Sequence, residues 1–311
     1  MPKRLFYNIE MFQRTLNKAV KFSGIGVHTG ELVEVEILPT ETSTGISFER
    51  GDLKGSPTIK ALAENVVATD FATTIGIDDC RISTIEHLMA AFYCLGVDNA
   101  HVIVGGPEMP ILDGSSALLV EMIEEAGLKT QNASREYLLV KKPIRVKDGE
   151  RFVYLLPFRS RSEEQTLTIE CTMDFTHPSL DRQSYSIDVT ADTFKEEIMR
   201  ARTYGFLKDV EMLRKNGFAK GGSLDNAIVL GEGYIMNEEG LRFPDEFVRH
   251  KVLDLIGDIS MAGRPIIGRV KAFLSGHGLN HSLVKEILKS TDSVEVVELV
   301  GADIKRGVGG N

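Results

Sequence analysis

An imidazole and two carboxylates share one column in the segment FVRHKVLDLIGD, residues 247–258. His250, Asp254 and Asp258 recur every four residues, so a helix would place them on one side. His250 and Asp254 could then chelate one metal ion, as the two histidines of a zincin helix do. The plainer interpretation is the polar face of an amphipathic helix in water. These two residues alone do not make a catalytic zinc site, because such a site takes about three protein ligands and leaves one position open for water.

A third ligand is available in STIEHLMAAF, residues 83–92, where Glu86 directly precedes His87. With His87 on the metal, Glu86 would be placed as the general base of a metal-assisted hydrolysis. Both residues also have a structural explanation. Ser83 and Glu86 match a capping box at a helix start, and His87 could be a hydrogen-bonded histidine of a partly buried helix. Spacing alone leaves both interpretations open.

Two further segments carry polar side chains suited to charge stabilisation. His277, in SGHGLNH (275–281), lies between a predicted strand and a predicted helix. An imidazolium there could stabilise a transition-state charge or protonate a leaving amine, and Asp258 could orient it and keep it charged. Thr203, in ARTYGF (201–206), has a hydroxyl that could donate to an oxyanion. A histidine at a helix start and a threonine at a helix end are the structural alternatives.

Composition excludes some classes of partner and compartment. The net charge of −9 argues against a nucleic-acid-binding protein, because such proteins draw affinity from basic patches. Three cysteines without a C-x-x-C pair indicate a reducing compartment. The first residues lack the pattern of a signal peptide, and no apolar stretch reaches the ~18 residues of a transmembrane helix. We therefore expect a cytoplasmic protein with no nucleic-acid partner.

The candidate residues fall on elements that recur in both halves of the 311-residue chain. Each half has a helix bearing a histidine, then a strand, a loop and a second helix. For this length two domains are expected, and the pattern predicts two related α+β domains. The N-terminal domain, 1–133, carries Glu86 and His87, and the C-terminal domain, 134–311, carries the other candidates. The polar segment LKTQNASREY, 128–137, is expected to be the linker. Periodicity predicts strands at 31–39, 99–106 and 166–175, and helices at 83–97 and 245–260.

Eight motifs occur in one order along almost the whole chain, and together they are very specific. They are GIGVHTGE, STIEHLMAA, PILDGS, DFTHP, RARTYGF, GGSLDNAIV, EFVRHKVLDLIGD and SGHGLNH. The sequence closely resembles the UDP-3-O-acyl-N-acetylglucosamine deacetylase family, zinc amidases that commit a sugar nucleotide to lipid A synthesis in Gram-negative bacteria. The resemblance extends from about Arg14 to Leu288.

The resemblance implies one catalytic metal ion, zinc, with iron(II) as the alternative in the cell. The family's ligands fall on the residues already singled out: His87, His250 and Asp254. Zinc in such a site lowers the pKa of a bound water. The expected assembly is a monomer, and the expected reaction releases acetate from the N-acetyl group of UDP-3-O-acyl-N-acetylglucosamine.

The catalytic roles of the family fall on four side chains. Glu86 takes the place of the general base, and His277 that of the second catalytic histidine, with Asp258 as its hydrogen-bonding partner. Thr203 takes the place of the oxyanion donor. Whether Glu86 or His277 protonates the leaving amine is left open by the sequence.

The substrate-binding roles follow in the same way. Lys251 corresponds to the lysine near the diphosphate, and Phe175 to the aromatic residue that stacks on uracil. Tyr204 stands where the family often has phenylalanine, which leaves the details of the sugar contact open. The family's second domain has a β-α-β insert that encloses the acyl chain, and residues 206–233 match it. Its expected apolar lining is Phe206, Val210, Met212 and Leu213, although ordinary core contacts would explain each of them.

The family fold has two α+β domains, each a small sheet with a pair of helices, packed so that helices face helices between the sheets.

Two other functions remain as alternatives. A non-catalytic metal- or sugar-nucleotide-binding module would have no use for Glu86, Thr203 and His277 together. A zinc hydrolase of another acylated sugar is disfavoured by Phe175 and Lys251, which suit a nucleotide. The preferred acyl-chain length does not follow from the sequence.

Overall fold

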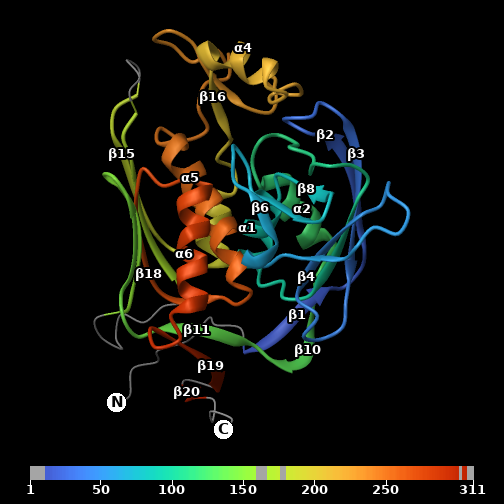
Figure 1. The fold of residues 1–311 in the computed structure, drawn as a ribbon, viewed down its shortest axis with the longest axis vertical. Helices are drawn as coiled ribbons and strands as arrows, with labels where there is room; N and C mark the ends of the chain where they lie inside the picture. Colours follow the sequence, from blue (N-terminus) through green and yellow to red (C-terminus); the bar gives the residue numbers. More distant parts are fainter. Residues whose placement is uncertain (1–10, 159–166, 176–179, 301–302, 307–311) are drawn as a thin grey trace.

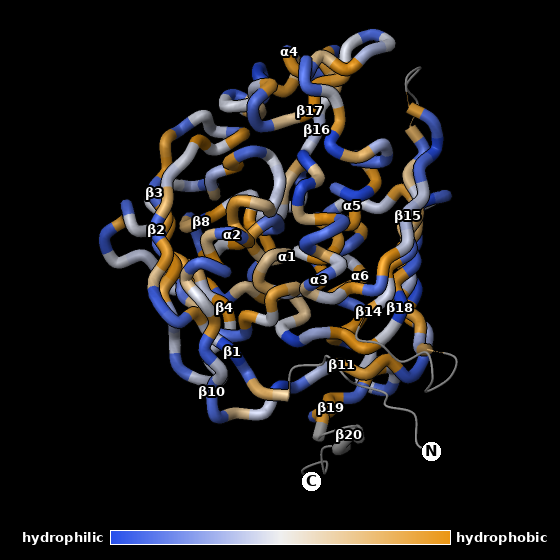
Figure 2. The backbone as a smooth tube through the Cα atoms, turned by 180° about the vertical axis from the view of Figure 1, so that it is seen from behind, coloured by the Kyte–Doolittle hydropathy of each residue, from blue (hydrophilic) through white to orange (hydrophobic). Residues whose placement is uncertain are grey.

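Two main sheets form the outer sides of the molecule, and the long helices lie between them (Figure 1). The computed structural model describes residues 11–158, 167–175, 180–300 and 303–306. One hydrophobic cluster runs through both halves of the chain and includes Phe48, Leu88, Leu253 and Val270. The loops at the periphery are largely hydrophilic (Figure 2). This arrangement confirms the predicted α+β class with helices packed between sheets.

The N-terminal half is built around a five-stranded sheet of order β2-β3-β9-β4-β5. Its strands are β2 (Val20–Ile25), β3 (Leu32–Pro39), β9 (Ala100–Val104), β4 (Ile46–Arg50) and β5 (Ile59–Lys60). A smaller sheet holds β6 (Val66–Ala68), β7 (Thr74–Ile77) and β8 (Cys80–Ile82). The helices are α1 (Glu86–Leu95) and α2 (Ala117–Ala126). Helix α1 ends at Gly96, whose φ of 71° is left-handed and suits a residue without a Cβ.

The C-terminal half has an eight-stranded sheet in which β18 (Ile266–Phe273) is central, pairing with β11, β13 and β14. The other strands are β11 (Glu136–Val140), β12 (Ile144–Asp148), β13 (Arg151–Leu156), β14 (Leu167–Met173), β15 (Gln183–Asp188), β19 (Val294–Val300) and β20 (Asp303–Arg306). Two helices, α5 (Glu246–Ile259) and α6 (His277–Lys289), cover the inner face (Figure 1). In the described part of the chain, no helix combines the length and apolarity needed to cross a membrane.

A β-α-β unit projects from the C-terminal half. Strand β16 (Tyr204–Phe206) pairs in parallel with β17 (Ile228–Leu230), and helix α4 (Leu207–Lys215) lies in the connection. Helix α4 stands at one end of the molecule, away from the central helices (Figure 1), and none of its residues is buried. The unit begins two residues before the predicted segment 206–233. A short helical segment, α3 (Ala191–Thr193) followed by a π-helix (Phe194–Ile198), precedes it.

The segment expected to be the linker, 128–137, joins the two halves, but it is mostly strand and not an irregular connection. Residues Leu128–Ser134 form β10, which pairs with β1 (Phe12–Leu16). The polar side chains that suggested a linker make specific contacts instead, because Gln131 accepts from the Asn99 amide and donates to the Thr40 carbonyl. Strand β10 leads directly into β11, so a paired strand carries the chain from one half to the other (Figure 1).

Candidate active site

Helix α5 is buried on nearly all sides, because it lies between α1 and the C-terminal sheet. His250, Asp254 and Asp258 are each no more than 3% exposed. The interpretation of this column as a face in water is therefore wrong. Burying three polar side chains costs free energy unless each finds a partner, so the column must be satisfied inside the protein.

A glycine allows α1 and α5 to cross at backbone distance. A Cβ on Gly257 would lie 2.1 Å from the main-chain oxygen of Glu86. No side chain fits there, so the start of α1 rests directly on α5 at the turn that carries Asp254 and Asp258. This close crossing brings Glu86 and His87 from the N-terminal half to the polar column of the C-terminal half.

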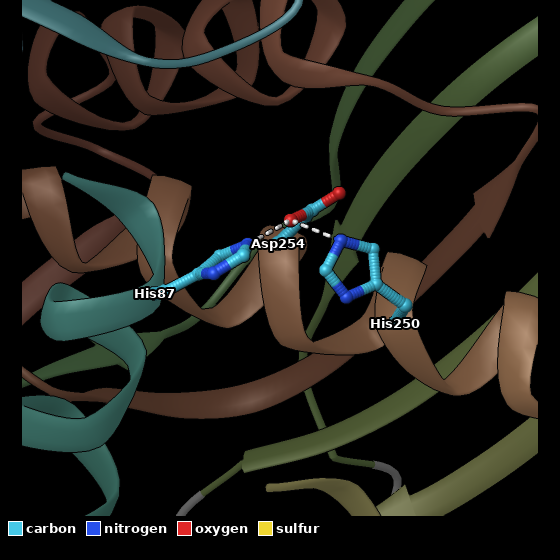
Figure 3. A group of neighbouring side chains, drawn as sticks. All are labelled: His87, His250 and Asp254. Atoms are coloured by element: carbon cyan, nitrogen blue, oxygen red, sulfur yellow. Dashed lines mark ion pairs between the residues drawn. The ribbon is translucent and has the colours of Figure 1, made fainter. Parts of the chain in front are cut away.

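Three side chains from the two helices converge on one point (Figure 3). His87 Nε2 lies 3.6 Å from Asp254 Oδ1, and His250 Nε2 lies 3.3 Å from the same oxygen. The two imidazole rings meet edge to face, with centroids 5.1 Å apart. One ligand atom from each of the three residues lies within 4.8 Å of the others. Two imidazoles and a carboxylate form a donor set that suits zinc.

The hydrogen bonds and charges of this cluster fit a cation. His250 Nδ1 donates to the Ala201 carbonyl at 3.1 Å, which leaves the lone pair on Nε2, as is usual for a metal-bound histidine. Burial lowers the pKa of His250 to about 3, so the ring is neutral. Burial opposes ionisation of Asp254, but Lys251, 2.8 Å from Oδ2, helps to hold the pKa of the carboxyl well below its usual range. Two acceptors, His250 Nε2 and Asp254 Oδ1, thus face each other, and a bound cation would stabilise both.

Glu86 lies next to this cluster and is not the capping residue that the sequence allowed. The N-cap of α1 is Ile85, without a side-chain cap, and the Ser83 hydroxyl accepts a hydrogen bond from Thr74. Glu86 Oε2 instead accepts from the Thr73 main-chain N–H at 3.0 Å. Burial raises the pKa of the Glu86 carboxyl. Glu86, Asp254 and His277 also form a group whose ligand atoms lie within 4.8 Å of one another.

His277 opens helix α6 and is paired with Asp258, as expected. Its Nδ1 donates to Asp258 Oδ2 at 2.9 Å. Burial alone would lower the pKa of His277, but the Asp258 carboxylate outweighs burial and raises that pKa to about 10. The ring is therefore an imidazolium at neutral pH, and its Nε2 faces Asp254 at 4.0 Å. The structure thus places a buried carboxyl and a buried imidazolium beside the cluster of His87, His250 and Asp254, which could hold a metal ion.

The expected substrate-binding residues gather on the side of His250. The Tyr204 ring packs near His250, with centroids 6.2 Å apart, and Phe175 packs against Tyr204 at 6.0 Å. Lys251 places its Nζ 5.3 Å over the Tyr204 ring while it bonds to Asp254. Phe206 follows on β16, 6.5 Å from Tyr204. Within the motif DFTHP, the last three residues lie outside the described part of the chain.

The position of Thr203 near His250 follows from the contacts of the residues on either side of it in the sequence. Ala201 bonds to His250 through its carbonyl, and Tyr204 packs on the same ring. The main-chain N–H of Thr203 donates to Gly114 at 2.7 Å, which ties this segment to the loop PILDGS. The residue therefore lies between two that contact His250.

Comparison with known proteins decides the family. A sequence model of the UDP-3-O-acyl N-acetylglycosamine deacetylase family matches residues 13–289. The chain belongs to this family. Among named UDP-3-O-acyl-N-acetylglucosamine deacetylases, it is 49% identical to that of Geobacter sp. (strain M21), over 93% of this chain and 92% of that protein. It is 47% identical to that of Myxococcus xanthus, over 92% and 89%. It is 45% identical to that of Campylobacter jejuni serotype O:2, over 93% and 96%.

Sequence reasoning missed three residues of this deacetylase-family site. Gly257 sets the helix crossing, and Thr73 and Asn280 both bond to Asp258. Gly257 lies inside the motif that was singled out, and a glycine within a helix is itself a signal of close packing. Asn280 lies in SGHGLNH, where the histidine drew attention instead. Thr73 lies directly before β7 and offered no signal in the sequence.

Proposed function

We propose that this chain hydrolyses the N-acetyl group of UDP-3-O-acyl-N-acetylglucosamine, releasing acetate and the free amine, the committed step of lipid A biosynthesis. Family membership supports the substrate. One observation carries the proposal: three buried ligand atoms meet beside a buried carboxyl and a buried imidazolium. This is the set of groups that hydrolysis of an unreactive amide requires.

His87, His250 and Asp254 would hold one divalent ion, which we propose is zinc, with iron(II) as the alternative in the cell. When bound, the ion would act as a Lewis acid and lower the pKa of a coordinated water. Lys251 occupies Asp254 Oδ2 and so directs Oδ1, which both histidines face, toward the ion. The hydrogen bond from His250 to the Ala201 carbonyl fixes the tautomer that can bind metal.

The side chains around the ion would move protons and balance charge. Glu86 would take a proton from the attacking water, and its raised pKa brings it closer to the optimum for a base at neutral pH. His277, charged through Asp258, would stabilise the negative charge of the transition state and is suited to protonating the amine. Thr203 would donate its hydroxyl to the oxyanion.

The substrate would extend from this centre toward Tyr204 and the β-α-β unit. Phe175 offers an aromatic face for uracil, and Lys251 supplies positive charge near the diphosphate in a chain of net charge −9. Phe206 leads into the unit, where Met212 is 53% exposed and available to an acyl chain. Each CH₂ group that is buried contributes about 0.8 kcal/mol to binding, so a long chain could supply much of the affinity.

The wider organisation is proposed on the same grounds. Two α+β domains, 1–133 and 134–311, would each supply part of the site, since His87 comes from one and Asp254 from the other. Three free, buried cysteines suit the reducing cytoplasm, and we propose that the protein acts there as a monomer.

The test is turnover of UDP-3-O-acyl-N-acetylglucosamine by the purified protein, followed as free amine, before and after treatment with a zinc chelator. Activity that is abolished by the chelator and restored by zinc would support the substrate, the reaction and the metal together. A metal-loaded protein that binds this substrate without releasing amine would instead favour a binding module.

A further inference from the structure

Thr73 lies between the two proton-transfer groups of the site. It directly precedes β7 and is 2% exposed. Its main-chain N–H donates to Glu86 Oε2 at 3.0 Å, and its hydroxyl donates to Asp258 Oδ1 in a short hydrogen bond. One residue therefore contacts both the proposed general base and the partner of the proposed catalytic imidazolium.

With the hydrogen bond from Thr73 to Oδ1, both carboxylate oxygens of Asp258 accept hydrogen bonds. The other oxygen, Oδ2, accepts from His277 Nδ1 at 2.9 Å and from the Asn280 amide at 2.8 Å. The side-chain oxygen of Asn280, Oδ1, in turn accepts from the Ser275 hydroxyl. With donors on both oxygens, the carboxylate cannot rotate about its χ2 angle without losing a hydrogen bond, and a lost hydrogen bond to a buried charge is costly. The direction of the His277 ring is fixed through this carboxylate.

Thr73 connects β7 to helices α1 and α5 directly, and to helix α6 through Asp258. The Thr73 carbonyl accepts from the Ile85 N–H at the start of α1, 3.4 Å away, and the side chain reaches α5 through Asp258. Asp258 then holds His277 at the start of α6. Glu86 on α1 and His277 on α6 are thus linked through one residue that precedes β7.

We propose that Thr73 is a positioning residue that sets the placement of Glu86 relative to His277 through its hydrogen bond to Asp258. The inference rests on the proposed function, because the two groups have to be aligned only if they act on one substrate. A misplacement of about 1 Å at such a site can cost about 100-fold in rate. Thr73→Val keeps the shape of the side chain and removes the donor, so it should lower kcat while KM changes little.

The kinetic test compares three variants of the metal-loaded protein. We expect Thr73→Val to lower kcat by about 10- to 100-fold, with KM within about twofold. Thr73→Ser keeps the hydroxyl and should recover most of the activity. Thr74→Val is the matched control, because Thr74 is the next residue and its hydroxyl bonds to Ser83, outside the site. In an Asp258→Ala background, Thr73→Val should cost little more, since its partner is already lost.

A measurement without substrate separates this inference from the proposed function. The Nδ1–H proton of His277, recognised by its loss in Asp258→Ala, should give a low-field NMR resonance that Thr73→Val shifts and Thr73→Ser leaves in place. An unshifted resonance in Thr73→Val would overturn the inference, as would full kcat in that variant or a loss of activity that serine does not restore. Lack of turnover by the wild-type protein would contradict the proposed function alone, and the resonance would still decide the role of Thr73.

Discussion

Replacing Gly257 with alanine should separate the two helices that assemble the site. The new Cβ would lie 2.1 Å from the Glu86 oxygen and 2.8 Å from its carbonyl carbon, so α1 and α5 must move apart by about 1 Å. Overpacking of this kind costs ~1–3 kcal/mol, while alanine in a helix interior recovers about 1 kcal/mol relative to glycine. We expect a net destabilisation of at most about 2 kcal/mol and a fall in Tm of no more than a few degrees.

The effect on the site should exceed the effect on stability. His87 moves with α1 and Asp254 with α5, so the same shift stretches the distance between two of the proposed metal ligands. Because a 1 Å error can cost about 100-fold in rate, kcat/KM should fall by about two orders of magnitude. The affinity for zinc, titrated against a competing chelator, should fall as well.

Gly222→Ala is the matched control for this substitution. A Cβ there would meet no atom nearer than 3.6 Å, so activity, metal affinity and Tm should stay near those of the wild type. If Gly257→Ala kept the wild-type metal affinity and kcat/KM, the close crossing would not be what positions the ligands, and the reasoning would be refuted.

Three further predictions concern single side chains. Glu86→Gln should retain bound zinc and lose most activity, and undiminished turnover would leave Glu86 with no role as base. Asp254→Ala should lose metal in elemental analysis, because a buried ligand and the partner of Lys251 disappear together; full occupancy would rule out the proposed ligand set. Burial raises the pKa of the Cys171 thiol to about 12, against ~8.5 in an unfolded chain. The contribution of the neutral thiol to the free energy of unfolding is therefore complete below pH ~8.5. Between pH ~8.5 and about 12 the thiol ionises only in the unfolded chain, so stability falls by up to about 1.4 kcal/mol per pH unit. Cys171→Ala should lose less stability than the wild type between pH 9 and 11 in denaturant titrations, and parallel curves would contradict the shift.

Spacing alone predicted the column of His250, Asp254 and Asp258, because side-chain direction in a helix depends only on local geometry. Whether the column faced water could not be predicted in the same way. Its burial is due to α1, which reaches it from the other half of the chain. Local patterns also misled, since Ser83 and Glu86 matched a capping box that the structure does not form.

The same limit explains the remaining errors. The polar residues 128–137 suggested a linker, but a strand that pairs at the edge of the fold can satisfy polar side chains through tertiary hydrogen bonds, as Gln131 does. Thr73 could not have been found, because its partner Asp258 is 185 positions away. The roles of the site residues came from motif resemblance, and the structure added their proximity.

The crossing of α1 and α5 also has a consequence for the order in which the protein folds. Contacts between residues as distant in sequence as Thr73 and Asp258, 185 positions apart, carry a large loop-closure entropy and tend to form late. During synthesis, His87 emerges long before its partners on α5, so the nascent N-terminal half would have only one of the three proposed ligands, too few to retain a metal ion. The ion would then bind only after the two halves have docked, and it would slow unfolding without guiding the earliest steps of folding.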